Sequence, residues 1–140
     1  MLAAVAAVAC SGSTSPGPEA SAVIGDWEWS SACCSIAGAA KNPNTEGFTY
    51  VLQFSADGTV TAVRNNDLVF TARYSVTRSR PSPGADPVTV VEYSAPLSLG
   101  PSFIATDHHV VEKLENGTLI LRNAECADCY GDWVFLPRLS

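Results

Sequence analysis

The feature that most constrains the fold is an alternation of apolar and other side chains with a period of two residues. Large apolar residues of the segments 48–55 and 68–77 fall on one face: Phe48, Tyr50, Leu52 and Phe54, then Leu68, Phe70, Ala72, Tyr74 and Val76. Successive side chains of a strand point to opposite faces, so this pattern predicts strands with one buried face. We find no amphipathic helical pattern and expect at most one helical turn, within residues 35–46.

Turn signals separate these segments at short intervals. Asp57-Gly58 and Asn116-Gly117 predict hairpin turns, because glycine adopts a positive φ at little cost. Three prolines mark residues 78–87 as a loop. The expected strands are 24–30, 48–56, 59–64, 67–77, 87–94, 108–114, 118–123 and 130–137, with residues 102–106 as either a ninth strand or the lead-in to the sixth. Short strands with sequential connections predict an all-β protein, an eight-stranded antiparallel up-and-down barrel.

A barrel of this size leaves room for one small ligand or for side chains alone. The expected inward residues that are candidates for ligand contact are Phe48, Tyr50, Leu52, Phe70 and Tyr74. Phe54 and Leu68 face the same way, and these bulky side chains together could fill the interior. Two functions therefore stay open: a binder of a small apolar molecule at the barrel mouth, or an envelope protein-interaction or protease-inhibitor-like barrel with a filled core.

The first 22 residues differ in composition from the rest of the chain. Residues 1–10, "MLAAVAAVAC", are apolar and end in small residues, as a secretory signal does. Residues 7–10, "AVAC", resemble the lipobox of bacterial lipoproteins, which implies lipidation of Cys10 and a membrane anchor. Residues 11–22 are rich in Ser, Pro, Gly and Ala and are expected to form a flexible tether to a domain at 23–140. We expect an extracytoplasmic lipoprotein, held by its lipid at the outer membrane of a Gram-negative bacterium.

The remaining cysteines are even in number, which in an exported protein indicates disulfides. They are Cys33, Cys34, Cys126 and Cys129. In a closed eight-stranded meander the end of the first strand lies beside the start of the last. We therefore expect two bridges between the 33/34 pair and the 126/129 pair, and the pairing stays open. Adjacent cysteines are an awkward zinc chelate, and a C-x-x-C redox motif normally opens a helix, so we expect no metal and no cofactor.

Acid–base residues are present without a recognisable catalytic pattern. The candidates are Asp107, His108, His109, Glu112, Glu125 and Asp128. His108 and His109 are adjacent on an expected strand, so they point to opposite faces and cannot serve one site. With 8 Lys and Arg residues and a net charge of −6, the chain lacks the basic clusters that bind nucleic acid. We expect neither an enzyme nor a nucleic-acid-binding protein.

Short motifs along the chain resemble those of small bacterial lipocalin-like lipoproteins, which are calycin-type β-barrels. They are "IGDWEWS" with Gly25-x-Trp27, "FSADGT" at 54–59, "NGTLIL" at 116–121 and a last aromatic strand ending near Arg138. The resemblance implies that Gly25 and Trp27 belong to a plug at the closed end of the barrel. It also implies that Arg138 lies over the Trp27 ring as a cation–π contact. The expected function is binding of a small hydrophobic ligand.

Overall fold

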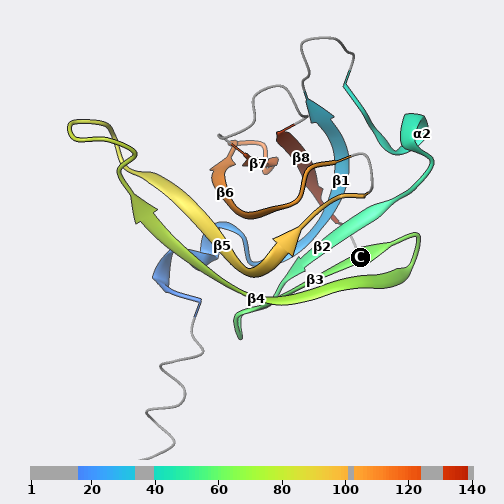
Figure 1. Ribbon diagram of the computed structural model, residues 1–140, viewed down its shortest axis with the longest axis horizontal. Helices are drawn as coiled ribbons and strands as arrows, with labels where there is room; N and C mark the ends of the chain where they lie inside the picture. The colour runs from blue at the N-terminus through green and yellow to red at the C-terminus, as the bar shows by residue number, and fades with distance from the viewer. Residues whose placement is uncertain (1–15, 34–39, 101–102, 124–130, 139–140) are drawn as a thin grey trace, which may run out of the picture.

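The computed structural model describes residues 16–33, 40–100, 103–123 and 131–138 as a closed antiparallel barrel (Figure 1). Each strand pairs with the next in sequence, and the last pairs with the first. The strands are β1 (Gly25–Cys33), β2 (Tyr50–Phe54), β3 (Thr59–Arg64), β4 (Asp67–Ser79), β5 (Val88–Leu97), β6 (Thr106–Lys113), β7 (Leu119–Arg122) and β8 (Asp132–Pro137). The expected eight-stranded up-and-down barrel is confirmed. Residues 103–105 are not strand, so they lead into β6.

The first and last strands close the barrel. In the β1–β8 ladder Trp27 lies opposite Pro137 and Cys33 lies opposite Asp132. The end of β1 therefore lies beside the start of β8, as the strand count predicted. Cys33 is disulfide-bonded, and its partner is not among the described residues. The expected sites at Cys10, Cys34, Cys126 and Cys129 also lie outside the described residues.

Buried side chains from all eight strands occupy the interior. Val23, which precedes β1, and Leu99, which follows β5, add to them. The largest fully buried side chains of the described residues are Trp29, Trp133, Tyr50, Phe135, Leu52, Leu97, Leu99, Leu119, Leu121, His109, Val23 and Val60. Burying a Leu or Phe side chain stabilises a fold by about 1.5–3 kcal/mol relative to leaving it exposed. The inward-facing residues of the strands thus supply most of the core, and they fill the barrel axis with side chains.

One residue that the alternation predicts to face inward instead faces outward. The β3–β4 register changes from Ala62 opposite Phe70 to Val63 opposite Leu68, so Val69 is an extra residue in β4. A bulge of this kind shifts the alternation by one residue. Leu68 is 65% exposed as a result, and the expectation that it faces inward with Phe70 is wrong.

The end of the barrel at the start of β1 is covered by a short 3₁₀ helix, η1 (Pro18–Ala22). Ala20 and Val23 are buried there, and the Val76 N–H donates to O of Pro16 at 2.8 Å. Residues 16–22 therefore pack on the barrel, which corrects their assignment to a flexible tether. The remaining tether, 11–15, and the signal segment, 1–10, lie outside the described residues.

Trp27 is buried beneath η1 at this covered end. Its indole Nε1–H donates to O of Val23 at 2.7 Å, and Gly25 has a φ of 138°, which favours glycine. The cation over the Trp27 ring is Lys113, with Nζ 5.5 Å from the ring centroid. Arg138 is exposed, and its N–H donates to O of Asp26. Arg138 thus extends the β1–β8 ladder opposite Asp26, which is exposed on the outer face. The Arg138 side chain therefore points outward and does not lie over Trp27, contrary to what the resemblance implies.

The segment between β1 and β2 contains one helical turn, α2 (Pro43–Glu46), as expected for residues 35–46. Asn42 caps it: its side chain accepts from the Thr45 N–H, and the Asn42 N–H donates to the Thr45 hydroxyl. No helix in the described part of the chain has the length and apolarity needed to cross a membrane.

Candidate ligand pocket

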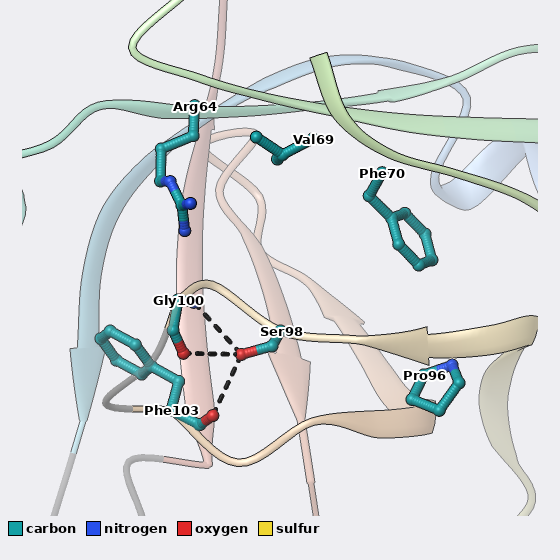
Figure 2. A pocket seen from close by; sticks show the side chains of 7 residues that line it. All are labelled: Arg64, Val69, Phe70, Pro96, Ser98, Gly100 and Phe103. Atoms are coloured by element: carbon teal, nitrogen blue, oxygen red, sulfur yellow. Dashed lines mark hydrogen bonds between the residues drawn. The ribbon is translucent and has the colours of Figure 1, made fainter. Parts of the chain in front are cut away.

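A pocket of about 500 Å³ lies at the barrel mouth, the end where β1 finishes. Figure 2 shows the residues that line it: Arg64, Val69, Phe70, Pro96, Ser98, Gly100 and Phe103. They come from the end of β3, the start of β4, the end of β5 and the chain that follows β5. The lining is mainly apolar and carries one charged side chain.

The pocket exists because the sheet opens between β4 and β5. Their ladder runs from Ser79 opposite Val88 to Tyr74 opposite Tyr93 and ends there. The next backbone donor, Arg73 N–H, bonds to Oγ of Ser94 at 2.9 Å instead of to a ladder carbonyl. Beyond this point β4 stays with β3, whereas β5 turns toward β6, as Figure 1 shows. A gap in the barrel wall results, and Figure 2 places Phe70 and Pro96 on its two sides.

The chain after β5 forms a fixed floor. The Ser98 hydroxyl accepts from the Gly100 N–H at 3.1 Å and lies 2.9 Å from O of Gly100 and 3.0 Å from O of Phe103. The Tyr50 hydroxyl, from inside the barrel, donates to O of Ser98 at 2.8 Å. Burial raises the pKa of Tyr50, which keeps this hydroxyl a donor, although the Arg64 charge opposes the shift.

Arg64 is the charged residue of the pocket. It follows Val60 and Ala62 on the inward face of β3, and its guanidinium carbon lies 5.8 Å from the centroid of the Phe48 ring. A Cβ atom at Gly100 would lie 3.3 Å from Arg64 Nη1, so glycine leaves room for the guanidinium. Within the described residues no carboxylate lies within ion-pair distance of Arg64.

Aromatic rings join the pocket to the core. Phe48 stacks on Trp29 with centroids 5.3 Å apart, and Phe103 meets Trp29 edge-on at 5.8 Å. Lys41 Nζ lies 5.2 Å from the centroid of the Phe103 ring. Two cations, Arg64 and Lys41, therefore flank this aromatic cluster at the mouth.

A second group of polar atoms lies inside the barrel, apart from the pocket lining. The Tyr93 hydroxyl is 2.8 Å from Nδ1 of His109, whose ring lies 4.6 Å from the Trp133 ring. Burial lowers the pKa of His109 to about 3, so the ring is neutral at pH 7. His109 Nε2 and Trp29 Nε1 are buried and have no hydrogen-bond partner among the described residues.

The expected ligand contacts fall into three groups. Phe70 lines the pocket, whereas Phe48 and Tyr50 support it from beneath. Leu52 and Tyr74 are buried in the core away from the pocket, and the Tyr74 hydroxyl donates to O of Ser55 at 2.6 Å. Sequence reasoning missed the other residues that line the pocket. The one available signal was Arg64, a charged residue at the end of the inward-facing alternation of β3.

The expected acid–base residues do not converge. His108 is partly exposed and 2.9 Å from a carboxylate oxygen of Asp107, while His109 is fully buried, so the two rings face opposite sides as predicted. Glu112 pairs with Arg122 on the outer surface. Glu125 and Asp128 lie outside the described residues. Across the described ranges, no three His, Cys, Asp or Glu side chains are grouped so that they could hold a metal ion.

Comparison with known proteins identifies no relative. No protein-family model matches the chain, and neither a curated protein nor a solved structure matches it. Membership of the lipocalin-like lipoproteins therefore stays a prediction, and a proposal about function depends on the fold and the pocket.

Proposed function

We propose that this barrel binds a small apolar molecule in the pocket at its mouth and has no catalytic role. The observation that carries the proposal is the gap between β4 and β5, which opens onto the apolar side chains of Val69, Phe70, Pro96 and Phe103. The volume of the pocket, about 500 Å³, falls within the range of about 300–1,000 Å³ that is typical of small-molecule sites.

The packed interior of the barrel decides where the proposed ligand can lie. Leu52, Leu121 and Phe135 are fully buried in the core, so a ligand on the barrel axis would have to displace packed side chains. The pocket at the rim needs no such displacement. The proposed ligand therefore lies against the wall at the mouth, between the β3–β4 hairpin and the chain after β5.

Export and lipid anchoring are part of the proposal. The apolar segment ending in Cys10 supports them, and so does the disulfide at Cys33, because disulfides persist in oxidising compartments. The proposed protein is an extracytoplasmic, lipocalin-like lipoprotein held to the outer membrane of a Gram-negative bacterium by its lipid.

The filled core also favours a second candidate function, an envelope protein-interaction or protease-inhibitor-like barrel. Such a protein needs a rigid scaffold and exposed loops rather than a cavity. Leu68, Ile104 and Leu136 are exposed apolar side chains that a partner protein could cover.

Titration with a neutral fluorescent probe, N-phenyl-1-naphthylamine, distinguishes the two functions. We expect saturable binding to the wild type and a loss of at least about tenfold in affinity, about 1.4 kcal/mol, in Val69→Trp, which fills the pocket. The matched control is Leu68→Trp, because Leu68 is the neighbouring residue and does not line the pocket. Absence of saturable binding to the wild type, or equal binding by both variants, would contradict the ligand proposal and favour the interaction barrel.

A further inference from the structure

We propose that the ligand is an amphipathic anion, with an acidic head group bound by Arg64 and an apolar tail lying against Val69, Phe70 and Pro96. This inference rests on the proposed function and adds to it the chemical class of the ligand and the residue that selects it.

Arg64 is the lining residue that is placed to meet an acidic head group. Its side chain leaves the end of β3 and extends into the space between Val69 and the chain at Gly100, as Figure 2 shows. The side chain is only partly exposed, with its guanidinium beside the Phe48 ring. A charge withdrawn from water without a counter-ion is unfavourable, and an anion in the pocket would relieve that cost.

Among the described residues, Arg64 has no carboxylate partner that would compete with a ligand. Asp67 lies opposite Arg64 across the Asn65-Asn66 turn, but the two do not form an ion pair. The Tyr50 hydroxyl, the other titratable group near Arg64, already donates to Ser98. Within the described residues the guanidinium therefore keeps its N–H groups for a ligand, and its planar fork suits the two oxygens of a carboxylate.

The charges and the apolar wall around the pocket also favour an anionic amphiphile. Lys41 lies on the far side of the aromatic cluster, over Phe103, so the mouth carries two cations in a chain with a net charge of −6. Gly100 lacks the Cβ atom that would crowd Arg64 Nη1. The wall beyond the guanidinium is apolar. A positive end and an apolar end within one pocket match an amphiphile with a negative head.

Isothermal titration with two probes of equal chain length, decanoate and decan-1-ol, tests the inference. At pH near 7.5 and below micelle formation, we expect decanoate to bind the wild type at least about tenfold more tightly than decan-1-ol. In Arg64→Gln the two probes should bind equally, with decan-1-ol unchanged. Added NaCl should weaken decanoate binding alone. The matched control is Arg73→Gln, because Arg73 is an exposed arginine of β4 whose side chain bonds to O of Asp57.

Each outcome separates the inference from the proposed function. If both probes bind the wild type with equal affinity, the inference is overturned and the proposed function stands. If neither binds, the proposed function fails. If Arg64→Gln keeps the preference for decanoate, Arg64 is not the anion site. Arg64→Lys checks that the loss is not caused by misfolding: it keeps the charge without the fork, so part of the preference should remain.

Discussion

The Tyr93 hydroxyl lies 2.8 Å from Nδ1 of His109 in the interior of the barrel. Both side chains are buried, and burial raises the pKa of Tyr93 and lowers that of His109. The two groups are therefore uncharged at pH 7, and one hydrogen bond joins the Tyr93 hydroxyl to Nδ1 of His109. This pair makes the stability of the barrel sensitive to the loss of a single oxygen atom.

Tyr93→Phe removes that oxygen and leaves His109 Nδ1 without its partner. We expect the free energy of unfolding to fall by about 1–3 kcal/mol, the usual cost of an unsatisfied buried polar group. Urea denaturation followed by tryptophan fluorescence measures it. His108→Gln, on the outer face of the same strand, should change the value by less than about 0.5 kcal/mol. Equal stability of Tyr93→Phe and wild type would show that the hydrogen bond contributes nothing.

Acid should destabilise the barrel through His109. Burial lowers the folded-state pKa of His109 to about 3, below the ordinary histidine pKa of 6.5. Between these two values the unfolded chain binds a proton that the native state excludes. The stability that depends on neutral His109 is complete above about pH 6.5. It falls as the pH drops toward 3, by at most about 1.4 kcal/mol per pH unit. Urea midpoints measured from pH 7 to pH 4 should show this slope in the wild type.

The matched variant for this pH dependence is His109→Gln, which cannot take up the proton. Its slope between about pH 6 and pH 5 should be shallower than that of the wild type. Proton NMR provides a second readout, because the His109 Cε1–H shift should stay constant over the same range. Identical slopes for the two proteins would assign the acid sensitivity to other groups, such as carboxylates.

Gly17 is required where the N-terminal segment meets β4. It has a φ of 99°, and a Cβ atom there would lie 2.8 Å from O of Val76. Gly17→Ala combines backbone strain with this clash, so we expect a loss of more than about 2 kcal/mol in thermal or urea unfolding. Gly84 has a similar φ, 84°, but a Cβ atom there would have no neighbour within 4 Å among the described residues. Gly84→Ala should therefore lower the free energy of unfolding by only about 1–2 kcal/mol. A smaller loss for Gly17→Ala than for Gly84→Ala would show that η1 does not depend on this contact.

The bond made by Cys33 should connect the two ends of the barrel sheet. Because Cys33 lies opposite Asp132, we expect a non-reducing peptide map to link the Cys33 peptide to the one that contains Cys126 and Cys129. Reduction should lower the free energy of unfolding by about 2–5 kcal/mol. A map that joins Cys33 to Cys34 alone, or a protein whose stability is unchanged by reduction, would contradict the cross-link.

The sequence allowed the strands to be predicted because they have an apolar face, and their short sequential connections predicted a closed barrel. Their even number then placed the end of the first strand beside the start of the last. The sequence did not reveal the bulge that turns Leu68 outward, since an extra residue is visible only against a partner strand. Lys113 over Trp27 was also missed. That contact depends on how the end of β6 approaches the covered end of the barrel, and no local pattern encodes it.

The pocket could be predicted only in part. Phe70 was identified from its alternation. Phe48 and Tyr50, which the alternation predicted only as inward-facing, lie beneath the pocket. Pro96, Ser98 and Gly100 were not identified, because they resemble an ordinary break after a strand. These residues line the pocket because the β4–β5 ladder ends at Tyr74 and Tyr93. Both strands continue beyond that pair, so the local sequence does not show that they separate there.

The pairing of β1 with β8 also has a consequence for synthesis. Cys33 and Asp132 are ladder partners although 99 positions separate them (132 minus 33). The second edge of β1 can therefore be paired only after the last strand has been synthesised. Until then the emerging sheet has two unpaired edges, along β1 and along the newest strand. Such edges are templates for association with other chains. A ribosome-bound or truncated chain that stops before β8 is therefore the form most exposed to aggregation, and the final strand removes that hazard.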